Sequence, residues 1–469
     1  MTPAVRRAAA ALALVAAALV CRGPLHAATF ALPVSNDDAI LLLMGRRVLA
    51  GELSTTLWNQ PYNGALDAYL LAPLLAVLPH HAAYRLYQAA CAALLVLLAG
   101  LLGRRLGGPA AGFAAALLAA CGTPYMALMA ATGPPPNFLM PLVTGGPLLA
   151  ALAARRLGGA ASLGLGLVCG LAVWNSSLAV PAFAGMAAGL AAAGFRPRPG
   201  AVAPFVAGAL LGAAPLAVAR AIGASGAKVV TASSAVTALR PRWLWGEGAA
   251  ALAHALAGLG GLQVPLVVDG RERALVPLPL VALLAAALLF AVVLGARSRA
   301  ALPLVGWAAA LAGAFWLSRR TGPDELRYLY GLNAPLLALA GAGVAAAWRR
   351  RRAAGAALVL ALVAPWGWGE RVLARTWSDP AHAERVWEVP AVGPPIEALR
   401  AAGLRSTYAS LQFAGRIALE TGGDVIASQA WNERIPGDPL RFRDEVDLDP
   451  AAAWTLSRRF SRGMPRPGG

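Results

Sequence analysis

Three aspartates follow the first apolar segment of the chain, at positions where a carboxylate can do chemistry. Asp37 and Asp38 are adjacent in "SNDDAILLLMGRR", and Asp67 follows in "QPYNGALDAYLL". A carboxylate can accept the proton of an attacking hydroxyl or amide group, so each is a candidate general base. Ser35 and Asp38 also have the spacing of a helix capping box, and acids are favoured in a first helical turn. Capping is the preferred interpretation of Asp38, both interpretations stay open for Asp67, and capping leaves Asp37 unexplained.

The composition indicates a polytopic membrane protein. Of the 469 residues, 58% are hydrophobic and 13% are charged, whereas about 25% charged residues is usual in soluble domains. The formal net charge of +18 comes largely from arginines in short turns between apolar runs. Topology therefore explains the charge better than a nucleic-acid partner does. The four cysteines lie in or beside apolar runs, without the spacing of a metal or redox motif.

About eleven apolar runs approach the roughly 20 residues that a transmembrane helix needs. They lie at about 5–22, 82–103, 109–131, 137–154, 158–175, 177–194, 202–222, 274–296, 300–318, 327–348 and 353–370. Every second turn between them is rich in arginine, which places those turns and the N-terminus in the cytoplasm. We expect an uncleaved signal anchor at the N-terminus, rather than a cleaved signal peptide.

The outer face is expected to carry the long segments: a first outer loop (30–81), a long outer loop (223–273) and the tail. Two short helices, at about 37–50 and from Asp67 to Pro79, are predicted to lie along the membrane interface. In the tail, "STYAS" and "DVIAS" predict strands flanking a helix. The expected organisation is an all-α membrane module (1–370) and a small α/β outer domain (371–469), whose last residues, "SRRFSRGMPRPGG", are expected to be disordered.

The first outer loop resembles that of the GT-C glycosyltransferases, in particular the bacterial dolichyl-phosphate-mannose protein mannosyltransferase-like group. The stretches "NDDA", "LAGEL" and "QPYNGALDAYLLAP", followed by a span that ends in "GRRLGG", carry the resemblance. The Asp-Glu-Ala signature of that group is matched by Asp37, Asp38 and Ala39, with Asp in the Glu position. Its Tyr-x-Gly-x-Leu-Glu stretch is matched by Tyr62 to Asp67, again with Asp for Glu.

The resemblance implies the GT-C fold and a site for each part of a sugar transfer. Asp37 corresponds to the catalytic base, beside Asp38 and Asp67, and Tyr62 and Asn63 belong to the substrate loop. "DELRYLYGLNAPLLALAG" is similar to the group's "RYLLPLYPALALLAA", so Arg327 and Tyr328 are the first candidates to bind the donor phosphate. The competing interpretation of Arg327 is an arginine that extends to the membrane interface. Further candidates for phosphate binding are Arg240 and Arg242.

The implied reaction is an inverting transfer of a hexosyl or pentosyl unit from a polyprenyl-phosphate donor. The acceptor is a glycan, lipid or protein on the outer side of a bacterial inner membrane, so membrane lipid is a partner. No metal ligands are assigned, and His80 and His81 are interpreted as a loop cap. Because some members of the class use a divalent cation and others do not, a cation cofactor stays open.

Two alternatives to an enzyme remain. A lipid or glycan transporter or flippase usually carries ionisable residues inside its spans, whereas the predicted spans are nearly free of charge away from their ends. A scaffold with an outer binding domain would use Asp37 only as a helix cap. The glycine-rich "GLGLVCG" (164–170) lies inside an apolar run, so we attribute it to helix packing rather than to a nucleotide-binding loop.

Overall fold

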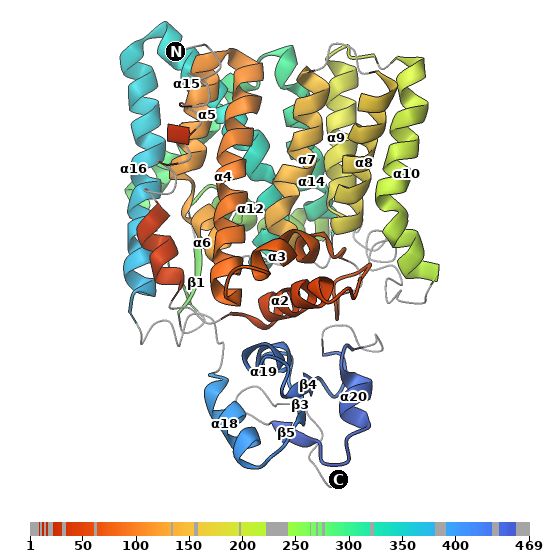
Figure 1. The fold of residues 1–469 in the computed structure, drawn as a ribbon. Coiled ribbons are helices and arrows are strands. Elements are labelled where there is room, and N and C mark those ends of the chain that lie inside the picture. The colour runs from red at the N-terminus through yellow and green to blue at the C-terminus, as the bar shows by residue number, and fades with distance from the viewer. Residues whose placement is uncertain are drawn as a thin grey trace. The chain divides into compact units, whose positions relative to one another are not determined.

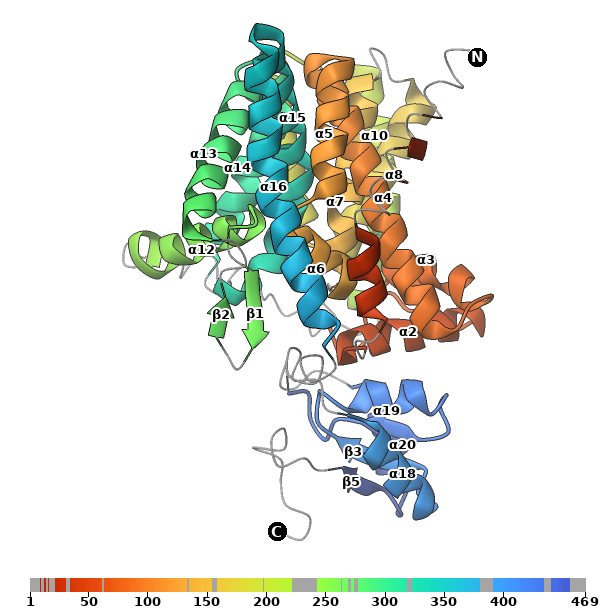
Figure 2. The same ribbon diagram turned by 90° about the vertical axis from the view of Figure 1, so that its left-hand side faces the viewer.

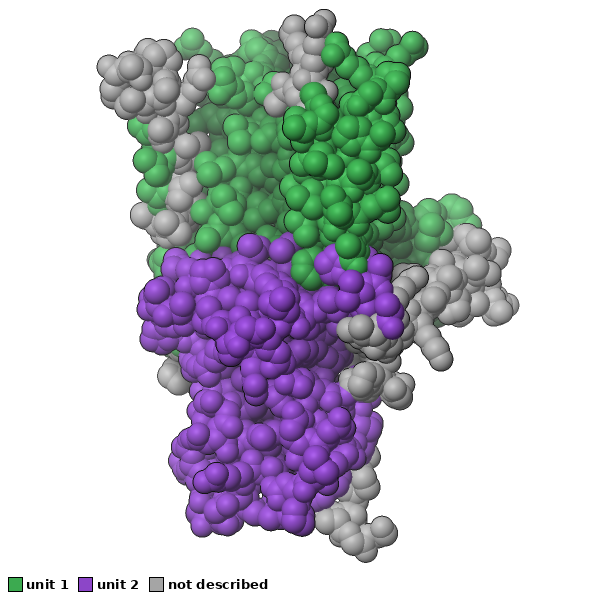
Figure 3. Space-filling view, turned by 45° about the vertical axis from the view of Figure 1, so that its right-hand side comes forward, with its two compact units in different colours: residues 1–31, 88–214, 229–379 green, residues 32–87, 215–228, 380–469 purple. Residues whose placement is uncertain are grey.

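The computed structural model is mostly helical and divides into two compact units, coloured separately in Figure 3. It describes residues 9, 12, 13, 16, 22–30, 34–60, 63–132, 135–153, 158–196, 198–221, 243–262, 264–268, 271–273, 277–318, 323–379, 391–433 and 440–455. Unit 1 comprises Met1–Ala31, Gln88–Ala214 and Val229–Asp379, and unit 2 comprises Leu32–Tyr87, Pro215–Lys228 and Pro380–Gly469. The first outer loop therefore groups with the tail.

Unit 1 contains the apolar helices, most of which run side by side in Figures 1 and 2. They are most of α4 (His80–Gly107), α5 (Pro109–Cys121), α6 (Pro124–Thr132), α7 (Pro135–Ala153), α8 (Gly159–Asn175), α9 (Ala179–Ala192), most of α10 (Pro199–Ala221), α12 (Gly248–Leu259), α13 (Leu278–Gly295), α14 (Leu302–Leu317), α15 (Asn333–Arg350) and α16 (Arg352–Trp377). Shorter elements are η1 (Trp243–Glu247), η2 (Arg299–Ala301), η3 (Pro323–Leu332) and the antiparallel strands β1 (Val264–Val268) and β2 (Arg271–Arg273).

Among the described residues, six helices are long and apolar enough to cross a membrane, and α5 with α6 forms a seventh candidate bent by 66°. Each predicted run from 82 to 370 coincides with a helix or with this bent pair. The run at about 5–22 lies mostly outside the described residues. These helices identify an integral membrane protein. The prediction of a long outer loop at 223–273 was incomplete, because this segment contains α12, an apolar helix that packs on η3.

A buried ion pair corrects the expectation of nearly charge-free spans. Helix α16 continues to Trp377, past the predicted end of its run at 370, so Glu370 lies inside a membrane-length helix and is 8% exposed. Its partner is Arg22, whose Nε lies 4.0 Å from Glu370 Oε1 and whose Nη2 donates to Ala119 O at 2.6 Å. The guanidinium lies beside Gly122, where α5 ends and the chain bends into α6. The bend provides the space that the arginine occupies.

Small residues let the helices of unit 1 approach closely. A methyl group at Gly166 or Gly170 would collide with backbone carbonyl groups of α10, which confirms helix packing as the role of "GLGLVCG". Helices α9 and α14 meet in the same way, since a methyl group at Gly185 would collide with the Gly306 carbonyl oxygen, and the reverse also holds. Backbone contact at these glycines therefore sets the spacing of two helix pairs.

Unit 2 contains α2 (Asn36–Leu49), α3 (Leu66–Leu75), the first turns of α4 and a small α/β fold. The α/β part comprises α18 (Gly393–Ala401), β3 (Ser406–Ala409), α19 (Ala414–Glu420), β4 (Ile426–Ser428), α20 (Arg443–Asp447) and β5 (Ala453–Thr455). Its sheet has the order β4-β3-β5 with parallel pairs, in which Thr407 is opposite Ala427 on one side and Ala453 on the other.

The predicted strands of the tail and the helix between them are confirmed as β3, β4 and α19. Because α19 connects two parallel strands, these elements form a crossover unit whose core includes Ile396, Phe413, Ile417 and Val425. The third strand, β5, and helices α18 and α20 were not predicted. The expected disordered end, residues 457–469, lies outside the described residues, and the predicted domain boundary at 370 falls within α16.

We predict that Gly185→Ala destabilises unit 1 by about 1–3 kcal/mol, because the added methyl group has to separate α9 from α14. Thermal unfolding of the protein in detergent measures the effect. Gly313→Ala is the matched control, since a methyl group at this glycine of α14 meets no atom within 4 Å. The control should be neutral or stabilising, as alanine favours helix more than glycine does. Equal unfolding temperatures for the two variants would contradict the packing argument.

Candidate active site

The first acidic residues of the chain build the start of helix α2. Ser35 Oγ accepts a hydrogen bond from the Asp38 backbone N–H at 3.3 Å, and Ser35 N donates to Asp38 Oδ2 at 3.3 Å. The Ser35 hydroxyl also donates to Asp38 Oδ2 at 2.8 Å. These reciprocal contacts satisfy backbone donors that a helix start leaves unpaired. The capping box predicted from the spacing of Ser35 and Asp38 is confirmed.

The other carboxylate oxygen of Asp38 is bound by a tyrosine of helix α4. The Tyr84 hydroxyl donates to Asp38 Oδ1, and the two side chains are 0% and 4% exposed. Burial raises the pKa of Asp38 from 3.8 to about 6, although the hydrogen bonds from Tyr84 and Ser35 and the charge of Arg85 act in the opposite direction. Asp38 therefore joins the start of α2 to the start of α4, at the cost of burying a carboxyl group.

Asp67 makes a second contact of the same kind one turn further along α4. The Tyr87 hydroxyl donates to Asp67 Oδ1 at 2.5 Å, and Asp67 is 1% exposed in the first turn of α3. Residues three positions apart share one face of a helix, so Tyr84 and Tyr87 bring both acids to the same side of α4. Helices α2 and α3 also pack against each other, at Gly45 of α2. The fold thus gathers the acids of the first outer loop.

A buried arginine belongs to the same cluster. Arg85 is 6% exposed, its guanidinium carbon lies 5.8 Å from the centre of the Tyr84 ring, and its charge acts on Asp38. The predicted site did not include Tyr84, Arg85 or Tyr87. The available signal was "YRLY" at the start of a predicted span, because an arginine and two tyrosines one turn apart are unusual in an apolar helix.

The remaining two residues of "SNDD" differ in their surroundings. Asn36 is 4% exposed, and its Oδ1 accepts a hydrogen bond at 2.8 Å from the backbone N–H of Gly415 in α19. Asp37 is half-buried, whereas Asn36, Asp38 and Asp67 are buried. Among the three aspartates, Asp37 is therefore the one that a molecule outside the fold can reach most readily.

The residues of the predicted substrate loop contribute less to this cluster. Asn63 Nδ2 donates to Gln60 Oε1 at 3.3 Å, and the Asn63 carbonyl accepts from Leu57 N at 2.9 Å, so Asn63 closes a tight turn.

Tyr62 of the substrate loop and the phosphate-binding candidates Arg240 and Arg242 lie outside the described residues. Arg327 and Tyr328 are half-buried in η3 of unit 1, with the Arg327 guanidinium carbon 5.3 Å from the Tyr328 ring centre.

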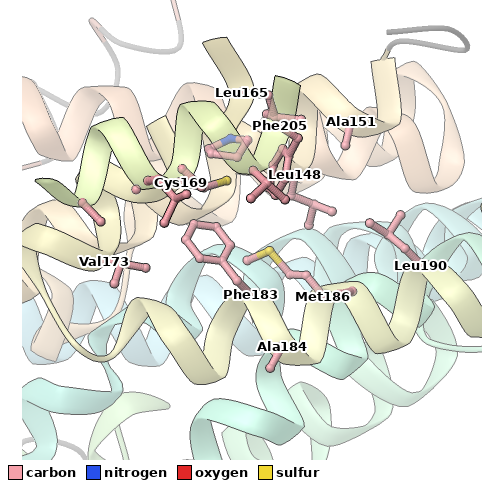
Figure 4. Close-up of a pocket in the computed structure, with 17 residues that line it drawn as sticks. Leu148, Ala151, Leu165, Cys169, Val173, Phe183, Ala184, Met186, Leu190 and Phe205 are labelled. Atoms are coloured by element: carbon pink, nitrogen blue, oxygen red, sulfur yellow. The ribbon is translucent and has the colours of Figure 1, made fainter. Parts of the chain in front are cut away.

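Unit 1 also contains an apolar cavity of about 570 Å³ between α7, α8, α9 and α10 (Figure 4). Its lining includes Leu148, Cys169, Phe183, Met186 and Phe205, and none of its 17 lining residues is charged. Figure 4 shows Phe183 and Met186 of α9 pointing toward α8 and α10. A cavity without polar groups favours a hydrocarbon chain over a sugar or a phosphate.

Comparison with solved structures identifies this architecture. ArnT from Cupriavidus metallidurans in the apo state matches with a TM-score of 0.61 and 14% identity, over 90% of this chain and 86% of ArnT. ArnT bound to undecaprenyl phosphate matches with a TM-score of 0.59, at the same identity and coverage. The chain has the GT-C fold.

A more distant match to the GT-C fold of this chain is the oligosaccharyltransferase AglB from Archaeoglobus fulgidus, in complex with an inhibitory peptide and a dolichol-phosphate. Its TM-score is 0.49 and its identity 13%, over 89% of this chain and 64% of AglB. Neither a protein-family model nor a curated protein sequence matches the chain. The two ArnT structures therefore show the fold, whereas overall sequence similarity is low.

We predict that Asp38 makes stability depend on pH. Because its pKa rises from 3.8 to about 6 on folding, the fold favours the protonated form. This stabilisation, about 3 kcal/mol, is fully present below the unfolded pKa and is lost as the pH rises through the folded pKa. Thermal unfolding in detergent from about pH 4 to pH 7 should show this loss, and Asp38→Asn should abolish it. Asp424→Asn, which changes an acid that is 81% exposed, is the control and should keep the wild-type slope. An unchanged slope in Asp38→Asn would assign the pH dependence to another group.

Proposed function

We propose that the protein is a membrane glycosyltransferase that transfers a sugar from a polyprenyl-phosphate donor to a glycan, lipid or protein acceptor on the outer side of a bacterial inner membrane. The observation that carries the proposal is the fold, which is shared with ArnT over 90% of this chain and 86% of ArnT. The solved ArnT complex contains undecaprenyl phosphate, a lipid phosphate of the donor class proposed for this chain. The gathered acids of the first outer loop supply the chemical groups that such a transfer needs.

Asp37 is the proposed general base because a base has to touch the acceptor. Asp38 and Asp67 are 4% and 1% exposed, and each carboxylate already accepts a hydrogen bond from a tyrosine hydroxyl. Asp37 is half-buried and lies in the first turn of α2, where the helix dipole favours a negative charge. In this arrangement Asp38 and Asp67 position the base, and Asp37 performs the proton transfer.

The reaction is a single displacement at the anomeric carbon. The acceptor oxygen or nitrogen forms a bond to that carbon while its proton passes to Asp37, and the bond between the carbon and the phosphate oxygen breaks. The electron pair of that bond leaves with the lipid phosphate, and attack from the opposite side inverts the configuration. Arg327 is the proposed cation for the departing phosphate, because a guanidinium ion stays charged and binds phosphate oxygens in pairs.

The isoprenoid chain of the donor requires an apolar surface within the membrane. The cavity between α7, α8, α9 and α10 is lined without charged residues and supports a lipid substrate. The alternative function is a lipid or glycan transporter that performs no transfer. The buried pair of Arg22 and Glu370 favours that alternative, since ionisable residues inside spans are common in transporters.

We predict that Asp37→Asn lowers sugar transfer by about 10²–10⁴-fold, because the amide cannot accept the acceptor proton. The measurement is transfer of labelled sugar from a polyprenyl-phosphate donor pool in membranes that contain matched amounts of each variant. Asp424→Asn is the control, as this acid is 81% exposed beyond α19 and should not change the rate. Equal transfer by Asp37→Asn and the wild type would show that another group is the general base. No transfer by the wild type with any donor would favour the transporter.

We predict that Arg327→Gln lowers transfer by about 10²–10³-fold through loss of charge at the leaving phosphate. Arg327→Lys should retain part of the activity, since lysine keeps the charge and loses the paired geometry. The measurement is kcat and KM for the lipid donor, with Arg351→Gln, an exposed arginine between α15 and α16, as the control. Full activity of Arg327→Gln would support the interpretation of Arg327 as an interfacial anchor.

A further inference from the structure

Two histidines and a glutamate meet in unit 2 at a place that the proposed sugar transfer does not use. His80 and His81 are the first two residues of α4, and Glu420 is the last residue of α19. Glu420 Oε1 lies 3.7 Å from His80 Nε2 and 3.4 Å from His81 Nε2. One nitrogen or oxygen atom from each residue falls within 4.8 Å of the other two.

These separations suit the shell of a metal ion better than hydrogen bonds. An N–H···O hydrogen bond in a protein usually spans about 2.7–3.2 Å. Ligand atoms held about 2.0–2.1 Å from a tetrahedral zinc ion are, by geometry, about 3.3 Å apart. The distances from Glu420 Oε1 to the two histidine nitrogens, 3.7 and 3.4 Å, lie nearer to the ligand spacing of a zinc ion than to the length of a hydrogen bond. In addition, His80 Nε2 is buried without a hydrogen-bond partner among the described residues.

We propose that His80, His81 and Glu420 bind one divalent transition-metal ion, with Zn²⁺ as the best fit. Two imidazole nitrogens and a carboxylate are a common zinc ligand set, and three protein ligands leave the fourth position for water. The partial exposure of the His81 and Glu420 side chains, 40% and 30%, gives an ion access to the site. This metal site is independent of the proposed glycosyl transfer.

Arg46 opposes metal binding in a defined way. Its Nη2 lies 3.1 Å from His80 Nδ1, and because a guanidinium group only donates, Nδ1 accepts and the ring proton is on Nε2. Coordination through Nε2 requires the proton on Nδ1, so the Arg46 guanidinium must move away. Arg46 also lines a cavity of about 280 Å³, which provides space for that movement. Arg416, one turn before Glu420, adds a second positive charge nearby.

A bound ion would join the start of α4 to the end of α19. The hydrogen bond from Gly415 N to Asn36 Oδ1 already attaches the other end of α19 to α2. His81 precedes Tyr84 by three residues on α4, so the metal would lie one turn from the tyrosine that holds Asp38. The role of the ion is therefore structural, as a second attachment between the α/β fold and the helices of the first outer loop.

The test is zinc binding by the full-length protein in detergent, after removal of metal with a chelator and dialysis. Titration calorimetry with ZnSO₄ and elemental analysis should show one ion per wild-type chain. Glu420→Gln and His81→Ala should each weaken binding by at least about 10-fold. Arg46→Gln should strengthen zinc binding by about 10-fold or more. The amide oxygen of glutamine can accept a hydrogen bond from a protonated His80 Nδ1, whereas the guanidinium group of arginine only donates. His254→Ala, in α12, is the matched control and should bind zinc as the wild type does.

Thermal unfolding gives a second readout that does not depend on catalysis. Saturating zinc should raise the unfolding temperature of the wild type and of His254→Ala, and should not raise that of Glu420→Gln. If Glu420→Gln does not fold, the affinities of His81→Ala and Arg46→Gln still decide the matter. The proposal is overturned if the wild type binds no zinc, if His81→Ala binds it as tightly as the wild type, or if Arg46→Gln weakens binding.

Discussion

The contact between Asp38 and Tyr84 is the constraint on which the candidate site depends. One carboxylate oxygen accepts from Tyr84 of α4, and the other accepts from Ser35 at the start of α2. Burial makes ionisation of this carboxyl group unfavourable, as its pKa of about 6 indicates. The fold tolerates that cost because the contact holds the start of α2 against the start of α4.

The four residues of "SNDD" differ in what they contact. Ser35 and Asp38 cap the helix, Asn36 accepts from Gly415 of α19, and Asp37 has the exposure that a reacting group needs. Two neighbouring aspartates thus differ in burial and contacts, because successive residues of a helix point about 100° apart. Asp38 holds the start of α2 to α4 through Tyr84, and its neighbour Asp37 is the proposed base.

Much of the fold could be predicted from local patterns in the sequence. The contacts between side chains that are far apart in the sequence could not. Apolar runs located the helices, the three-residue spacing of Ser35 and Asp38 predicted the capping box, and "STYAS", "DVIAS" and the helix-like stretch between them predicted β3, β4 and α19. The partners of the acids were missed because Tyr84 lies 46 residues from Asp38 and Tyr87 lies 20 residues from Asp67. Periodicity reports which face of an element is apolar, but it does not report which polar groups on different elements meet. The pair of Arg22 and Glu370 was missed for the same reason.

The hydrogen bond between Gly415 and Asn36 has a consequence for how the protein is made. Its two residues are 379 positions apart, so nearly the whole chain is synthesised before this bond can form. Helix α2 leaves the ribosome early and must wait, with Asn36 solvated or bound by something else, until α19 has emerged. The attachment of the first outer loop to the α/β fold is therefore made only at the end of biogenesis. A chain released before residue 415 would lack the bond that attaches its first outer loop to α19.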